Sequence, residues 1–228
     1  MAMMRVINLE NKSNITDEDV RWYLIDEQIW ITKCSEYSQI EDMIKLSVGS
    51  FNTIYDINDT MMFDKTSGEF HTGIIGLNSK IQIDPCDEPF IEKNIKKGNL
   101  QLKDMKNQSF VFPEKVVYSQ TKDYLISFSD KFAQKNYELI LVSNDFGFFV
   151  YDYELIGWML RNAHDHIFIN DTSVVIEKNV LVDYLNAVRR LDDNDKSEFT
   201  KMIDRDELKG KPQYRMLLKA IKDICDWY

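Results

Sequence analysis

Cysteine is scarce in this chain of 228 residues, and its distribution excludes two classes of small protein. The three cysteines, Cys34, Cys86 and Cys225, are an odd number, and no two of them form a CxxC pair. A disulfide framework needs paired cysteines, and a cysteine-based zinc site needs thiolates in short motifs. The sequence therefore predicts reduced thiols that are partly buried.

Long hydrophobic runs and the usual catalytic motifs are also lacking. The apolar stretches are only a few residues long, whereas a membrane-spanning helix needs about 20, and the N-terminus turns polar at once. We therefore expect a cytoplasmic protein with no membrane partner. No GxSxG, HExxH or glycine-rich phosphate loop occurs, and only eight glycines are present. The sequence accordingly predicts no catalytic residue and no cofactor.

Positive charge is in deficit: the chain has 28 Lys and Arg but 38 Asp and Glu, which gives a net charge of -10. The acidic excess lies in residues 1–60 and 121–175, while the rest of the chain is balanced. Phosphate binding needs a basic face, so this distribution disfavours nucleic acid as a partner. It allows a basic protein partner, and it is equally compatible with acidity that only keeps the protein in solution.

What the sequence does have is a stretch of strand-length apolar runs at residues 137–160. Residues 139–142, 146–151 and 155–160 are rich in branched and aromatic side chains. The two breaks between them contain Asn and Asp, which tolerate the left-handed backbone of tight turns. This pattern predicts a three-stranded antiparallel meander, around which we expect the rest of the chain to be organised.

Both ends of the chain add elements to this centre. A Thr16 to Asp19 capping-box pattern allows a short helix, but the β-branched residues that follow favour a hairpin of residues 20–25 with 29–32. Residues 35–46 repeat apolar side chains at helical spacing. After residue 176 the period is helical to the end, which predicts three amphipathic helices.

Together these patterns predict an α+β fold. We expect one mostly antiparallel, twisted sheet, with one N-terminal helix and a C-terminal helical segment packed on it. Residues 1–228 are predicted to form a single domain, β-rich over residues 1–176 and helical over residues 177–228.

The chain has only three histidines, and they are the one candidate metal site. His164 and His166 would point to the same face of a strand, and His71 on another strand would supply a third imidazole. An HxH spacing is common by chance and nothing downstream completes a ligand pattern, so surface or turn histidines without a metal are the favoured interpretation.

Aromatic side chains next to acidic ones are the more informative feature. Successive side chains of a strand point to opposite faces, so the aromatic residues of the meander cannot all face one core. Either helices bury the second face, or it stays open as a protein-binding patch. The predicted partner-binding residues are Trp22, Trp30, Asp145, Tyr151, Asp152, Tyr153, Glu154 and Trp158.

These observations favour a small acidic protein that binds or inhibits a basic protein partner, for example an immunity-type protein of bacteria that neutralises a basic toxin. One alternative is an accessory or structural protein of a phage or mobile element. The other is a metal-dependent enzyme that uses His164 and His166. The sequence indicates no particular oligomeric state.

Overall fold

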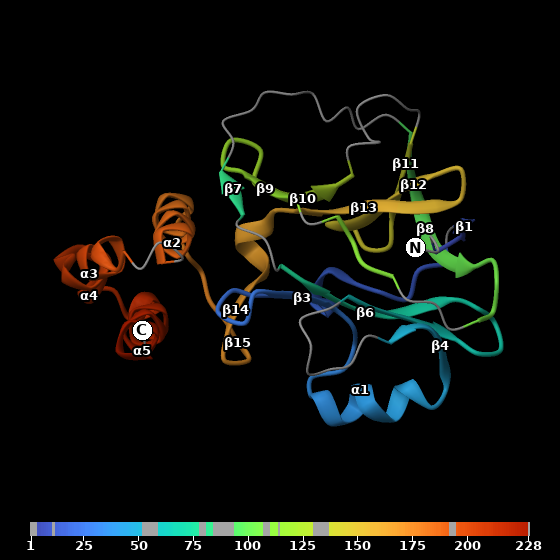
Figure 1. The fold of residues 1–228 in the computed structure, drawn as a ribbon, viewed down its shortest axis with the longest axis horizontal. Coiled ribbons are helices and arrows are strands. Elements are labelled where there is room, and N and C mark those ends of the chain that lie inside the picture. Colours follow the sequence, from blue (N-terminus) through green and yellow to red (C-terminus); the bar gives the residue numbers. More distant parts are fainter. Residues whose placement is uncertain are drawn as a thin grey trace.

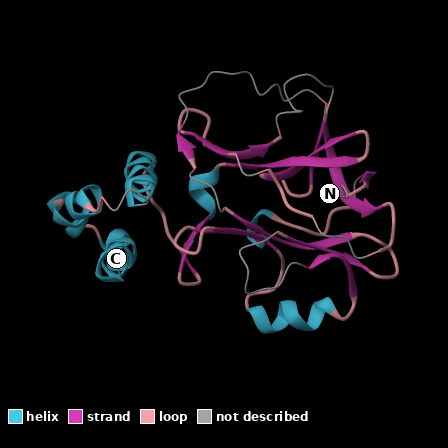
Figure 2. Cartoon of the chain, viewed as in Figure 1, coloured by secondary structure: helices cyan, strands magenta, loops and turns pink. Residues whose placement is uncertain are grey.

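The computed structural model describes residues 4–10, 12–51, 59–77, 81–83, 94–106, 110–113, 115–129, 137–191 and 195–227. Within them the chain forms two β-sheets, drawn one above the other, with a group of helices at one end (Figures 1 and 2). Cys86 lies outside the described residues, and Cys34 and Cys225 are free thiols.

The first sheet has eight strands and contains the predicted meander at its centre. In spatial order its strands are β1 (Val6–Glu10), β8 (Ile95–Leu102), β11 (Glu138–Leu141), β12 (Phe146–Tyr151), β13 (Glu154–Arg161), β10 (Tyr124–Phe128), β9 (Val116–Ser119) and β7 (Gln82–Ile83). β11, β12 and β13 pair antiparallel, which confirms the meander.

The second sheet has seven strands. They are β15 (Thr172–Ser173), β14 (Ile167–Ile169), β2 (Val20–Tyr23), β3 (Gln28–Ile31), β6 (Phe70–Gly76), β5 (Thr60–Asp64) and β4 (Ser47–Phe51). β2 and β3 form the predicted hairpin, and the capping box before them caps only a single 3-10 turn, η1 (Asp17–Asp19).

The expectation of one mostly antiparallel sheet is wrong, because there are two sheets and both are mixed. β8 pairs parallel with β11, β7 with β9, and β14 with β2. Short turns force only consecutive strands to be antiparallel, and each of these parallel pairs joins strands that are distant in the sequence. Local turn chemistry therefore determined the hairpins but not the neighbours of each hairpin.

The sheets bury apolar side chains on both of their faces. A large cluster between the sheets includes Trp22, Phe148 and Trp158, all nearly inaccessible to solvent. On the outer face of the second sheet, Trp30 packs in a smaller cluster with Ile40 of helix α1 (Tyr37–Ile44), the predicted N-terminal helix. A third cluster, which includes Phe149, occupies the outer face of the first sheet. Strand alternation thus supplies two apolar faces to each sheet.

In its described residues, 177–191 and 195–227, the C-terminal segment forms four α-helices rather than the predicted three. They are α2 (Lys178–Leu191), α3 (Ser197–Asp204), α4 (Asp206–Lys209) and α5 (Arg215–Trp227). The 3-10 turn η4 (Pro212–Tyr214) directly precedes α5, and the 3-10 turn η3 (Ala163–His166) lies between β13 and β14. They lie beside one end of the two sheets and do not cover a sheet face (Figure 1). The expectation that these helices roof the meander is therefore wrong, because the second sheet packs there instead.

The hairpin of β4 and β5 depends on Gly49, and replacing Gly49 with alanine should destabilise the protein by about 2–3 kcal/mol. Gly49 has φ +137°, and a Cβ there would lie 2.1 Å from the Met61 carbonyl oxygen. Urea unfolding measures the loss. Gly210→Ala is the matched control, because Gly210 has ordinary helical angles and a Cβ there would lie 3.5 Å from its nearest neighbour. Equal stability of the two variants would contradict this account.

A buried carboxyl, Asp59, predicts a pH dependence of stability. It accepts backbone N–H bonds from Phe112 and Gly76, and burial raises its pKa from 3.8 to about 6. A raised pKa means that the fold favours the neutral carboxyl, so its contribution is full below pH 4 and is lost as the pH rises through 6. The loss amounts to up to about 3 kcal/mol.

Asp59→Asn removes this ionisation while every other carboxylate is unchanged. The difference in free energy of unfolding between the variant and the wild type should rise, in favour of the variant, between pH 4 and pH 7. Urea unfolding at several pH values measures it. A difference that is constant with pH would show that Asp59 ionises normally in the folded protein.

Candidate functional site

The faces of the meander do not provide the predicted open surface. Phe148 packs between the sheets, and Phe149, which points the other way, is only 2% exposed. The expectation of a free front on the meander is therefore wrong. Any surface that the meander offers lies at its ends and along its edges.

The three tryptophans of the predicted partner-binding set are interior residues. Trp22 and Trp158 lie in the cluster between the sheets, and Trp30 lies between the second sheet and α1. They are at most 4% exposed, so they support the fold and offer no contact area to a partner. An aromatic residue in a strand is common both in a protein core and at a binding surface. All three tryptophans belong to the core.

Three more members of the set make internal contacts instead of gathering into a patch. The carboxylate of Asp145 accepts hydrogen bonds from the amide of Asn162 (2.9 Å) and from His166 Nε2 (3.2 Å). Tyr151 is half-buried against the outer cluster of the first sheet. Glu154 begins β13 and bridges to Arg5 through the backbone.

The last two members, Asp152 and Tyr153, line an open groove, and three residues that sequence reasoning missed join them there. The groove holds about 500 Å³. We call it the acidic groove and define it by Glu10, Lys96, Glu138, Asp152 and Tyr153. Its polar side chains come from β1, β8, β11 and the β12–β13 turn, four segments that are far apart in the sequence.

Strand alternation explains why the groove is polar. Val6 and Ile140 belong to the core between the sheets, and Glu10 and Glu138 are on the same faces of their strands by the two-residue period. The inward-facing positions of β1 and β11 thus change from apolar to acidic along each strand. The sequence carries this signal, but only a known sheet order shows that these strand ends meet.

The electrostatics of the acidic groove leave carboxylate in excess. Lys96 Nζ contacts the Glu138 carboxylate at 2.7 Å, and that hydrogen bond, with a smaller contribution from Glu10, raises the pKa of Lys96. Asp152 has no ion-pair partner among the described residues. Among the described residues that line the groove, one ammonium therefore faces three carboxylates, while Lys103 and Arg5 lie outside the lining, against the Tyr153 ring. The lining itself is suited to receive a further cation.

The turn that carries Asp152 and Tyr153 is held firmly in place. Both residues have positive φ, 46° and 66°, as a two-residue hairpin turn with right-handed twist requires. The Tyr153 carbonyl accepts a hydrogen bond from Val6 N (2.7 Å). Lys103 Nζ lies 3.5 Å from the centre of the Tyr153 ring. The rim of the groove is thus fixed by β1 and by a cation–π contact.

The three histidines do not form a common metal site. His164 Nδ1 contacts Asp123, His166 contacts Asp145 and the Val20 carbonyl, and His71 contacts Ser47 and Thr72 instead. In the part of the chain that the structure describes, no three His, Cys, Asp or Glu side chains are grouped as metal ligands. Each imidazole instead has its own hydrogen-bond partners.

A buried carboxylate, Asp123, connects the first sheet to the C-terminal helical segment. It is only 3% exposed, and it accepts a hydrogen bond from the Tyr118 hydroxyl (3.1 Å) beside its contact with His164. Lys178 Nζ, in the first turn of α2, lies 3.5 Å away. These partners neutralise a charge that is costly to bury, so we interpret the cluster as structural.

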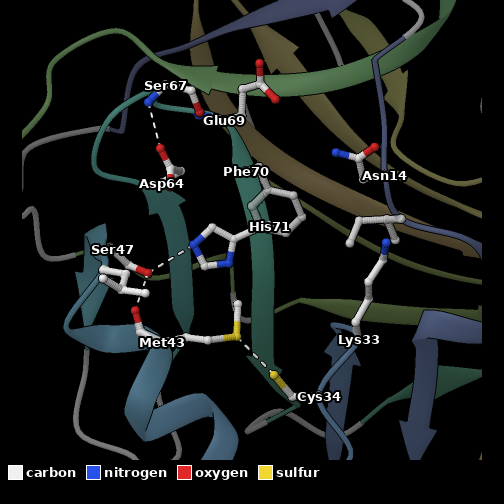
Figure 3. A pocket seen from close by; sticks show the side chains of 12 residues that line it. Asn14, Lys33, Cys34, Met43, Ser47, Asp64, Ser67, Glu69, Phe70 and His71 are labelled. Atoms are coloured by element: carbon white, nitrogen blue, oxygen red, sulfur yellow. Dashed lines mark hydrogen bonds between the residues drawn. The ribbon is translucent and has the colours of Figure 1, made fainter.

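His71 and Ser47 are adjacent, as the nucleophile and base of a hydrolase would be, but their hydrogen bonds run in the wrong direction (Figure 3). The Ser47 hydroxyl donates to the Met43 carbonyl (2.6 Å), which can only accept. Since its single proton is used there, His71 Nε2 must donate to Ser47 Oγ (3.0 Å). A catalytic base must accept the serine proton, so this pair is not an activated nucleophile.

The other ring nitrogen of His71 continues the same chain of hydrogen bonds. His71 Nδ1 lies 3.2 Å from Thr72 Oγ1, and the Met43 sulfur, a weaker acceptor for the same hydroxyl, lies 3.9 Å from it. Because burial lowers the pKa of His71 and favours a neutral ring, and the proton of that ring is on Nε2, Nδ1 accepts from the Thr72 hydroxyl. Thr72 Oγ1 in turn lies 3.0 Å from the Thr32 hydroxyl, which accepts from Cys34 N. With that neutral ring, one consistent direction runs through every bond, from Cys34 N to the Met43 carbonyl.

This chain of bonds predicts the protonation state of His71, whose pKa is lowered from 6.5 by burial. Nitrogen NMR of the imidazoles should show the Nε2–H form of His71 at neutral pH and a titration midpoint below 6.5. An Nδ1–H form, or a midpoint at or above 6.5, would show that the chain of hydrogen bonds is directed otherwise.

Among the described residues, no helix combines the length and the apolar character needed to cross a membrane. Comparison of the sequence with protein-family models finds no match, and comparison with curated proteins finds none either.

Proposed function

We propose that this protein binds a basic protein partner through the acidic groove. The observation that carries the proposal is the meeting of Glu10, Glu138 and Asp152, from three separate segments, around one open groove of about 500 Å³. Of the described residues that line it, Lys96 is the one basic residue. A groove of this size and sign suits a lysine or arginine side chain presented by another protein.

The overall charge supports the same partner. A net charge of -10 attracts a basic protein over a distance of about one Debye length, roughly 8–10 Å in physiological salt. Such attraction raises the association rate, while the groove supplies the local contacts that select one binding mode. An inhibitor of the immunity type, which covers a basic target, is the specific form of this proposal.

The groove is also sufficiently rigid to recognise a defined group. Gly98 of β8 lies so close to β1 that a Cβ there would be 2.3 Å from Asn8 Oδ1 and 2.4 Å from the Leu9 carbonyl oxygen. This close approach fixes the spacing of the two strands that carry Glu10 and Lys96. A preorganised site loses less conformational entropy on binding, and so gains affinity from each contact.

The test is co-purification of the partner, followed by affinity measurement with a charge-neutral double variant. Glu10→Gln with Asp152→Asn keeps the size of both side chains and the turn geometry while it removes two charges from the groove. We expect the dissociation constant to rise about tenfold or more, and its salt dependence to become weaker.

Glu41→Gln with Asp223→Asn is the matched control, since it removes two exposed carboxylates that do not line the groove. Its affinity should stay within about twofold of the wild type, as for surface charges in general. An equal loss of affinity in both double variants would show that net charge alone attracts the partner, and would contradict a specific role of the groove. Failure to recover any partner at low salt would contradict it.

A further inference from the structure

A second cavity, apart from the acidic groove, lies beside helix α1. It holds about 390 Å³, within the range of small-molecule sites. Its walls come from the segment before η1, the β3–α1 connection, the end of α1 and the β5–β6 turn (Figure 3). The apolar part of the lining is Ile15, Cys34, Met43, Leu46 and Phe70.

One wall of this cavity has no hydrogen-bond donor to spare. Ser47 and His71 both line it, and the Ser47 hydroxyl proton and both ring nitrogens of His71 are used in the chain of hydrogen bonds between Met43 and Cys34. Burial lowers the pKa of His71 and keeps its ring neutral at physiological pH. A bound molecule therefore meets this wall as a neutral surface, and polar recognition must come from the rim.

The rim separates the two signs of charge. Lys33 and Asn14 lie on one side of the cavity, and Asp64 and Ser67 lie on the other (Figure 3). Among the described residues, neither the Lys33 ammonium nor the Asn14 amide has a hydrogen-bond or ion-pair partner. Two donors are thus available on one side.

On the other side of the cavity, the Asp64 carboxylate is hydrogen-bonded to the backbone, and both Asp64 and Glu69 would repel an anion. Asp64 Oδ1 accepts the backbone N–H groups of Thr66 (2.8 Å) and Ser67 (2.7 Å), and these bonds lower its pKa and keep it ionised. Glu69, which follows in the same turn, adds a second negative charge to the lining. An anionic group would therefore be directed away from this turn and toward Lys33.

The apolar side chain of Leu46, at the mouth of the cavity, is exposed to solvent. Leu46 is 70% exposed, although it belongs to the lining of the cavity. A molecule with an apolar body in the cavity would remove part of this side chain from water, at a gain of about 25 cal/mol for each Å² buried. The cavity therefore offers apolar area and one cationic anchor.

We propose that this cavity binds a small organic anion, with an apolar body against Phe70 and Met43 and a carboxylate or sulfonate held by Lys33 and Asn14. The apolar body supplies most of the affinity. The two carboxylates across the cavity set the orientation, because they repel the anionic group. The site is independent of the acidic groove, which selects a cation.

The test uses 8-anilinonaphthalene-1-sulfonate, an apolar anion whose fluorescence rises in an apolar environment. We expect saturable binding of one probe to each folded chain, and displacement of the probe by decanoate but not by decylamine at the same concentration. Absence of saturable binding, or displacement by the amine as readily as by the carboxylate, would overturn the proposal.

Two exposed positions allow variants that preserve the core, with circular dichroism and thermal unfolding as checks of folding. Lys33→Glu should weaken probe binding about tenfold by reversing the anchoring charge, and Leu46→Asp should weaken it to a similar extent by removing apolar contact and adding repulsion. Lys45→Glu is the matched control, since Lys45 is exposed nearby and does not line the cavity. Wild-type affinity in Lys33→Glu, or an equal loss in Lys45→Glu, would place the probe elsewhere and overturn the proposal.

Discussion

Packing of two sheets against each other is the constraint on which the rest of this structure depends. Trp22 of the second sheet and Trp158 of the first are at most 1% exposed in the core between them. Burial of side chains of this size stabilises the fold by roughly 2–3 kcal/mol each. The indole nitrogens of both residues are buried without a hydrogen-bond partner among the described residues, which costs about 1–3 kcal/mol each. That such a cost is tolerated shows how strongly apolar packing and shape determine this interface.

The same constraint explains why the aromatic residues became core and the acidic residues became surface. In β12, Phe148 points between the sheets and Phe149 points outward into a second buried cluster. A central strand with two covered faces has no room for a binding patch, so polar contact areas lie where strands end. The acidic groove lies at such ends, and the cavity beside α1 lies among connections. Function in this fold is therefore expected at its rim.

Sequence reasoning predicted what depends on near neighbours. The meander of residues 137–160, the hairpin of β2 with β3, and helix α1 follow from period, propensity and turn residues, and the structure confirms them. The second sheet and the three parallel strand pairs depend on contacts between distant segments, which no local pattern specifies. Asp152 and Tyr153 are predicted as partner-binding residues because they lie in a turn that the local sequence specifies. The place of Glu10 and Glu138 in the same groove follows only from the sheet order, in which β1 and β11 flank β8.

The ion pair between Lys96 and Glu138 determines how the acidic groove can work. In the proposed complex, a partner cation in the groove would compete with Lys96 for Glu138, so part of the attraction it gains would be offset by a contact it weakens. Asp152 has no such internal competitor among the described residues, and Glu10 has only a weaker electrostatic interaction with Lys96. Since both groups of the ion pair are about 40% exposed, the pair itself contributes at most about 1 kcal/mol. Lys96 therefore lowers the cost of holding three carboxylates together in the free protein without closing the groove to a cation from outside.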